Sequence, residues 1–352
     1  MQLKKIISLI TLPLFVCTMA CKDDLTEETD TKDGVIHFSV NLPPADQTKG
    51  TPVNNVTDTA FNTIGILGYH TSVDFEKSSN PTSSFLANEI VRKTKTNIWN
   101  FDKIHYWPQK GVVSYFAYAP FASPENGISI TELQNENPVL TYQVPHEVAK
   151  QPDLMVATPQ FNKYKEVIPL NFTHALACIG FDVSGENILI DSIGIRGVYT
   201  SGTLNLTLTD NTPLWSNLTG VTDKFYKVGL KENPMATNPS SNVMATNGYL
   251  MMIPQTLGDD AAIIIKFKGT DPKIIPLKTA GTTQWRAGDK YIYTLKEGTY
   301  NFEVIPETTT FDYFGGKNAL NIKSTYTSQA GLTQNLGWKA EIISSSPQNI
   351  YW

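Results

Sequence analysis

The chain has 352 residues, of which 41% are hydrophobic and only 17% are charged. Its formal net charge of −5, without a basic cluster interleaved with aromatic side chains, argues against nucleic acid as a partner. The charged fraction lies below the usual quarter, so the chain is polar mainly through uncharged residues, as is common for extracellular β-proteins.

The N-terminal residues 1–20 have the pattern of an export signal. Lys4 and Lys5 precede an apolar run, 6–19, that is too short to cross a bilayer comfortably and is followed by small residues. Thr-Met-Ala-Cys at 18–21 resembles a bacterial lipobox, which implies that Cys21 becomes a lipidated first residue anchored in the outer membrane. The alternative is an ordinary cleavage site next to a chance cysteine.

Residues 21–34 are polar and acidic and predict a flexible tether. Its first residues, Lys22-Asp23-Asp24, resemble the surface-export signal of Bacteroidetes lipoproteins, which implies a surface-exposed lipoprotein; a tether facing the periplasm is the alternative. Cys178 lies in an apolar run and is expected to be a small buried hydrophobe, so no disulfide framework is expected.

The first predicted strand covers residues 35–42. The apolar residues Ile36, Phe38, Val40 and Leu42 alternate there with polar ones. This alternation predicts a strand with one apolar face toward the core and one wet face. A second strand is expected at 61–69, and 85–91 is interpreted as a short helix.

Residues 107–120 predict the strand around which the first domain is built. After a turn at 109–111, the run is apolar on both faces, with Val113, Tyr115, Ala117 and Ala119 on one and Val112, Phe116 and Tyr118 on the other. Only a strand covered on both sides can use that composition. A short buried helix is the alternative, which the β-branched and aromatic residues disfavour.

Short strands separated by turn residues continue to residue 298, which indicates sandwiches and not βαβ units. The expected fold is therefore all-β. The predicted domains are an N-terminal β-sandwich at 35–184, a C-terminal β-sandwich at 185–298, and a small β-rich segment at 299–352. That last segment resembles the start of a BACON-type or other Ig-like module, and the expectation is a small or incomplete domain.

Four stretches together resemble the Bacteroidales fimbrillin family, the subunits of type V pili. They are Phe-x-Val-x-Leu at 38–42, Tyr-Trp-Pro…Phe-Ala-Tyr-Ala-Pro at 106–120, Asp-Leu-Met-Val-Ala at 153–157 and Leu-Asn-Phe-Thr-His-Ala-Leu-Ala at 170–177. The resemblance implies two tandem transthyretin-like β-sandwiches. It also implies a fimbrium whose subunits join by donor-strand exchange after a trypsin-like protease removes the tether and first strand.

Carried onto this chain, the resemblance makes Lys49-Gly50 the candidate cleavage site and 35–42 the candidate released strand. The family usually has Arg where this chain has Lys49. Without cleavage the protein would stay lipid-anchored with its first strand in place, as an anchor or accessory subunit would. A solvated loop lysine is the alternative interpretation of Lys49.

No chemistry is evident in the sequence. The five histidines are scattered without ligand spacing, and no nucleophile elbow, Walker loop or zinc-protease motif occurs. We expect no catalytic residues, metal or cofactor.

Two hypotheses therefore come from the sequence. The first is a non-enzymatic fimbrial subunit, tip or anchor that assembles by strand exchange. The second is a lipid-anchored surface protein that binds glycans or host proteins without polymerising. Most tryptophans are expected in the core, and Trp215 is the candidate ligand contact.

Overall fold

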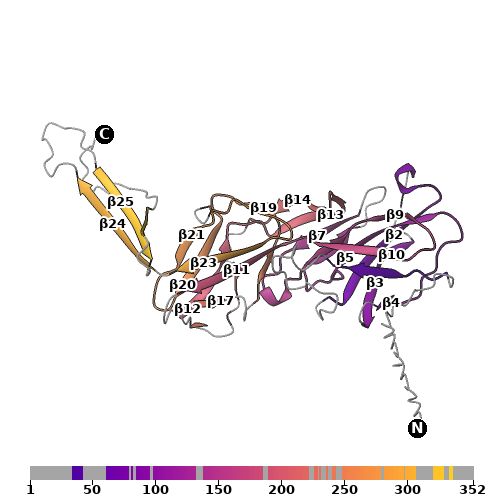
Figure 1. The fold of residues 1–352 in the computed structure, drawn as a ribbon, viewed down its shortest axis with the longest axis horizontal. Coiled ribbons are helices and arrows are strands. Elements are labelled where there is room, and N and C mark those ends of the chain that lie inside the picture. The colour runs from indigo at the N-terminus through magenta and orange to yellow at the C-terminus, as the bar shows by residue number, and fades with distance from the viewer. Residues whose placement is uncertain are drawn as a thin grey trace, which may run out of the picture.

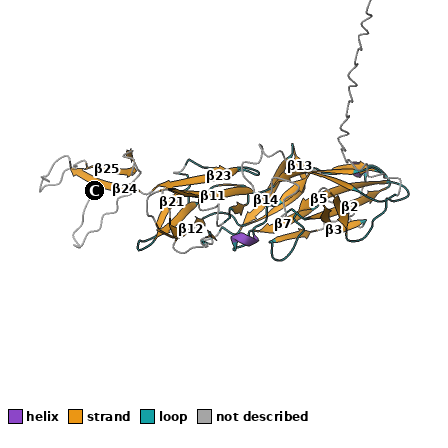
Figure 2. Cartoon of the chain, turned by 60° about the horizontal axis from the view of Figure 1, so that its bottom comes forward, coloured by secondary structure: helices purple, strands orange, loops and turns teal. Residues whose placement is uncertain are grey.

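The computed structural model describes residues 34–42, 61–78, 81, 85–95, 98–131, 138–184, 189–221, 226–228, 230, 235–236, 240–242, 248–278, 281–296, 298–306, 320–328 and 333–335. Strands dominate these residues, as predicted, and the helical elements among them are the short 3-10 turns η2 (Phe75–Lys77) and η3 (Val148–Lys150). Figure 2 shows the strands arranged along an elongated molecule. No helix in this part of the chain is long and apolar enough to cross a membrane.

The N-terminal sheet has the strand order β1-β10-β8-β5-β2-β3-β4, with β9 also paired to β5. Its strands are β1 (Phe38–Asn41), β2 (Thr63–Thr71), β3 (Leu86–Lys95), β4 (Ile98–Phe101), β5 (Val112–Ala119), β8 (Met155–Ala157), β9 (Gln160–Lys163) and β10 (Ile168–His174). It lies at one end of the molecule in Figure 1.

Strand β5 has the two buried faces that the sequence predicts. Val113, Tyr115, Ala117 and Ala119 belong to a core enclosed by the N-terminal sheet, while Phe116 and Tyr118 belong to a second core on its other side. The strand is therefore covered on both sides, and the helical alternative is wrong for these residues.

The expectation of a short helix at 85–91 is wrong, because these residues belong to β3. This strand pairs antiparallel with β2, where Ile64 lies opposite Val91, and with β4, where Val91 lies opposite Phe101. Its side chains alternate only irregularly between buried and exposed, so long-range pairing and not local periodicity decides the conformation.

A second sheet, β14-β13-β7-β6, packs against the N-terminal sheet. Its strands are β6 (Ile128–Thr131), β7 (Val139–Gln143), β13 (Ser201–Thr209) and β14 (Thr212–Thr219). The predicted division near residue 185 falls between β11 and β12, which belong to different sheets, and β13 after it pairs with β7 before it. The domain boundary stays a prediction.

The next sandwich consists of two facing sheets. One has β11 (Ala177–Ser184) between β23 (Lys290–Lys296) on one side and β17 (Ser240–Asn242) and β18 (Leu250–Met252) on the other. The second sheet is β12 (Leu189–Arg196), β15 (Tyr226–Lys227), β16 (Met235–Ala236), β20 (Ala262–Phe267) and β21 (Lys273–Pro276). Residues of both sheets, including Phe181, Ile193 and Ile265, join the second core, which is continuous with the N-terminal part.

Two small sheets complete the described part. Strands β19 (Gln255–Thr256) and β22 (Gln284–Trp285) form a short ladder. Strands β24 (Gly298–Pro306), β25 (Leu320–Ser328) and β26 (Thr333–Asn335) form an antiparallel sheet, and β24 and β25 project from the end of the molecule opposite the N-terminal sheet (Figure 1). Whether residues 299–352 form a complete Ig-like unit stays a prediction.

Candidate functional site

The first predicted strand has the two-sided character that its sequence indicates. Ile36 and Phe38 are buried, Val40 and Leu42 are half-buried against the same core, and the intervening Ser39 and Asn41 are exposed. The four side chains chosen from the sequence therefore share one side of the strand.

Strand β1 joins the sheet in an arrangement that the sequence does not reveal. It runs parallel to β10, with Phe38 opposite Ile168 and Val40 opposite Leu170. The neighbours are about 130 residues apart in the chain, so no hairpin ties β1 to the strand it pairs with. Long-range, non-covalent contacts hold it in the sheet.

The start of this segment is also bonded on its other side. The Ile36 amide donates to the His105 carbonyl at 3.0 Å, and the Trp107 amide donates to the Gly34 carbonyl at 2.9 Å. On the β10 side, the Ile168 amide donates to the carbonyl of His37 at 3.0 Å. Residues 34–41 therefore fill the space between β10 and the segment that follows β4.

Phe38 shows how β1 covers the core enclosed by the N-terminal sheet. Its ring lies 5.4 Å from that of Phe101 in β4 and 5.8 Å from that of Tyr115 in β5, both in edge-to-face geometry. The first and last strands of the sheet are thereby brought together around one core. Burying Ile36 and Phe38 contributes about 1.5–3 kcal/mol each, while losing the strand would expose the core and two rows of backbone groups.

Three of the predicted site residues, Cys21, Lys49 and Gly50, lie outside the described residues. Lipidation and processing therefore stay predictions.

Trp215 differs from the other described tryptophans. Trp99, Trp107 and Trp285 are buried, as expected for core residues, whereas Trp215 on β14 is half-buried. Its indole nitrogen donates to the Ala175 carbonyl at 2.8 Å, and its ring lies 6.3 Å from that of Tyr142. The ring is thus held in one position with part of its surface accessible.

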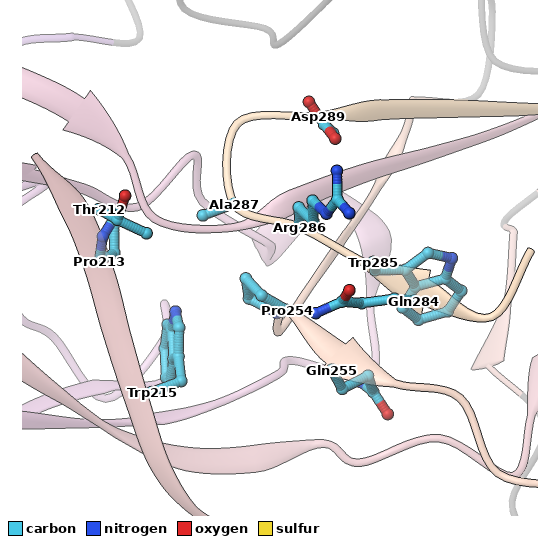
Figure 3. A pocket seen from close by; sticks show the side chains of 10 residues that line it. All are labelled: Thr212, Pro213, Trp215, Pro254, Gln255, Gln284, Trp285, Arg286, Ala287 and Asp289. Carbon is cyan, nitrogen blue, oxygen red and sulfur yellow. The ribbon is translucent and has the colours of Figure 1, made fainter. Parts of the chain in front are cut away.

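A pocket of about 530 Å³ lies beside Trp215. Its walls come from β14, from Pro254 before β19, and from the end of β22 with the turn that follows it. Figure 3 shows the Trp215 ring nearly edge-on across the pocket from Gln284 and Arg286. In the sequence, Trp215 lies about seventy positions before Gln284 and Arg286, and no motif links them.

The turn between β22 and β23 is tied down at several points. The Gly288 amide donates to the Leu176 carbonyl and the Asp289 carbonyl accepts the Cys178 amide, both at 2.9 Å. The Tyr291 hydroxyl accepts the Arg286 amide at 3.0 Å and donates to an Asp289 carboxylate oxygen at 3.3 Å. A glycine at position 288 suits this turn, because its φ is +75°. Arg286 and Asp289 are therefore presented by rigid backbone.

The described residues hold one buried ionisable pair. His174 Nδ1 lies 3.0 Å from Asp153 Oδ1, and both side chains are almost inaccessible. Within the described ranges, no group of three or more His, Cys, Asp or Glu residues could hold a metal ion.

Comparison with known proteins gives the class of this protein. The sequence model of the fimbrillin-like family matches residues 51–333. This match covers most of the chain, so the chain belongs to the fimbrillin-like family. None of the curated proteins matches it.

Three solved structures with which the chain aligns come from Bacteroides species. A fimbrial protein from Bacteroides vulgatus is 15% identical, with a TM-score of 0.50, over 82% of this chain and 98% of that one. A putative cell adhesion protein from Bacteroides uniformis is 16% identical, with a TM-score of 0.49, over 84% and 99% of the two chains. Another putative cell adhesion protein, from Bacteroides ovatus, is 14% identical, with a TM-score of 0.47, over 74% and 91%.

Family and fold together define a fimbrial, adhesion-type subunit of the cell surface, a class that is typically not enzymatic.

Proposed function

We propose that the protein is a surface lipoprotein of a type V fimbrium and that it joins other subunits by strand exchange. In this proposal β1 keeps the precursor closed, and a strand from a neighbouring subunit later takes its place. The observation that carries the proposal is the position of residues 34–41 between β10 and residues 105–107, over a core that they cover with Ile36 and Phe38.

Backbone hydrogen bonding supports this mode of assembly. A vacant position beside β10 offers amide and carbonyl groups to any extended chain, and apolar pockets select alternate side chains. The parallel pairing makes β1 well suited to release, because no hairpin joins it to β10. One cut between β1 and β2 would leave only non-covalent contacts to hold the strand.

The proposed cut is between Lys49 and Gly50, and the proposed lipid is on Cys21. The family match begins at residue 51, directly after this position. The projecting β24–β25 hairpin is a candidate source of an inserted strand, because it extends away from both sandwiches (Figure 1). In this proposal, a chain that is not cut would serve as an anchor or an accessory subunit.

The test is the mature N-terminus of protein purified from the bacterial surface, measured by mass spectrometry. A start at Gly50 supports processing and the replacement of β1. A lipidated Cys21 in the final form would contradict that replacement and would indicate an anchor or a binding protein that does not polymerise. Lys49→Gln should abolish the Gly50 start, and Lys49→Arg, which keeps the basic side chain, should retain it. An N-terminus that is neither Cys21 nor Gly50 would contradict the proposal.

A further inference from the structure

We propose that the pocket beside Trp215 binds an uncharged saccharide. This adhesive site is separate from strand exchange: it lies on β14 and the β22–β23 turn, and β1 contributes nothing to its lining. The pocket volume of about 530 Å³ falls within the range of small-ligand sites, which are typically about 300–1,000 Å³.

The apolar wall suits one face of a sugar ring. The indole of Trp215 is fixed by its hydrogen bond to Ala175 and backed by Tyr142, so stacking on it costs little conformational entropy. Pro213 and Pro254 add rigid apolar surface on either side of the pocket, as Figure 3 shows. The C–H face of a hexose can bury against such a surface.

The opposite wall supplies hydrogen-bonding groups for hydroxyls. The side chains of Thr212, Gln284 and Arg286 make no hydrogen bond to another residue within the described part of the chain. Amide, guanidinium and hydroxyl groups provide both donors and acceptors, which is what vicinal sugar hydroxyls require. By contrast, the Gln255 side chain is fully used by Tyr199 and Ile253 and can only line the pocket.

The charge of the pocket favours an uncharged ligand over an acidic one. Arg286 and Asp289 contribute formal charges of +1 and −1, which sum to zero, and Figure 3 shows the guanidinium directed toward the Asp289 side of the turn. Both residues are bonded to the Tyr291 hydroxyl, through a backbone amide and a carboxylate, so they stay close together. A sialic acid or phosphate would meet the carboxylate as well as the cation.

The test is binding of the full chain to an array of neutral oligosaccharides and their sialylated counterparts, followed by titration of each oligosaccharide that binds. Two variants remove exposed polar groups, Arg286→Ala and Gln284→Ala, and Arg92→Ala on the distant β3 is the matched control. Trp215→Phe tests the aromatic wall while keeping a large ring. Urea unfolding of each variant verifies that it is folded.

We expect at least one neutral oligosaccharide to bind, at least a tenfold loss of affinity in Arg286→Ala and Gln284→Ala, and no change in Arg92→Ala. Three results would overturn the proposal: no neutral oligosaccharide binds, only sialylated ones bind, or folded pocket variants bind as the unchanged chain does. Because none of these variants alters β1 or Lys49, fimbrial assembly should proceed in all of them, which separates this proposal from the previous one.

Discussion

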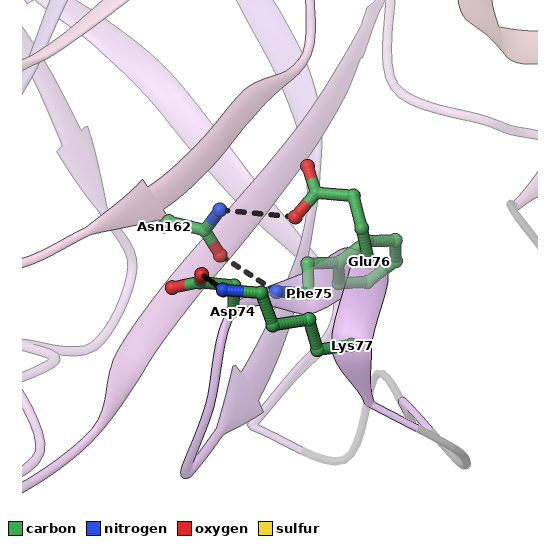
Figure 4. Close-up of polar contacts among 5 residues, drawn as sticks. All are labelled: Asp74, Phe75, Glu76, Lys77 and Asn162. Atoms are coloured by element: carbon green, nitrogen blue, oxygen red, sulfur yellow. Dashed lines mark hydrogen bonds and ion pairs between the residues drawn. The ribbon is translucent and has the colours of Figure 1, made fainter.

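At the residue scale, Asn162 shows how one side chain fixes a turn. Its Oδ1 accepts the Phe75 amide at 2.7 Å and its Nδ2 donates to Glu76 at 3.2 Å, as Figure 4 shows, while its own amide donates to the Ser114 hydroxyl. Asn162 has a φ of +56°, which asparagine tolerates better than most residues. It thereby holds η2 against β9 and keeps the Phe75 ring in the core.

Asn162→Ala should lower the free energy of unfolding by about 2–5 kcal/mol. The variant loses two hydrogen bonds, worth about 0.5–1.5 kcal/mol each, and places alanine in a left-handed conformation that costs about 1–2 kcal/mol. Asn162→Gly loses the same bonds without that strain and should be less destabilised. Urea denaturation measures both, and an unfolding midpoint of Asn162→Ala equal to that of the unchanged chain would refute this role.

The buried thiol of Cys178 should make the free energy of unfolding fall as the pH becomes alkaline. Burial raises the pKa of its thiol from 9.0 to about 12, with Lys290 opposing the rise and Asp153 adding to it. The folded state therefore holds the proton more tightly than the unfolded state. The resulting stability is complete below pH 9 and is lost as pH rises toward 12.

The free energy of unfolding of the unchanged chain should fall faster than that of Cys178→Ala above pH 9, by about 1.4 kcal/mol for each pH unit. Other groups titrate equally in both proteins, so the difference isolates the thiol. Val183→Ala, a truncation on the same strand that keeps the thiol, should retain the steeper slope. Chemical denaturation at a series of pH values measures the slopes; identical slopes for Cys178→Ala and the unchanged chain would contradict this assignment.

At the scale of elements, β1 is the strand whose removal most alters its surroundings. Phe38→Ala should destabilise the protein by roughly 3 kcal/mol, because it empties the space between Phe101 and Tyr115. Hydrogen exchange should speed up at the Ile168 amide, which is bonded to the His37 carbonyl. The control Ser39→Ala, at the neighbouring exposed position, should change neither the free energy of unfolding nor the exchange rate at the Ile168 amide. Unaltered exchange at this amide in Phe38→Ala would show that the Phe38 ring does not hold β1 in place.

The strands that the sequence predicts well are those whose own side chains carry the signal. Residues 112–119 are apolar on both faces and prove to be covered on both, and the alternation from Ile36 to Leu42 gives the buried side of β1. Strand β3 was missed because its residues are mixed in character and its pairing with β2 and β4 is long-range. The parallel register of β1 with β10 is also long-range, and it could not be predicted from the sequence for that reason.

The pocket shows the limit of sequence interpretation more sharply. Trp215 stands out because it lies in the turn-like sequence Thr-Pro-Leu-Trp-Ser-Asn, and it is the half-buried tryptophan among those described. Arg286 and Asp289 carry no comparable signal, since Arg-Ala-Gly-Asp resembles any turn between strands. Only the folded chain brings that turn opposite β14.

At the scale of the whole molecule, the two sandwiches share one continuous core. Leu67 and Phe116 from the N-terminal sheet and Ile193 and Ile265 from the C-terminal sandwich belong to the same buried cluster. The buried His174–Asp153 pair joins the end of β10 to the segment before β8. The buried side chains of β1 belong instead to the separate core enclosed by the N-terminal sheet.

The measurement that tests strand exchange most directly is the size distribution of the folded protein after cleavage at Lys49, with and without a synthetic peptide of residues 34–42. We predict that the cleaved protein forms a ladder of multimers and that the peptide suppresses it by refilling the position beside β10. A peptide carrying Phe38→Asp should not suppress it, because a carboxylate cannot enter that core. Cleaved protein that stays monomeric after β1 has dissociated, or multimers that both peptides leave unchanged, would contradict the account.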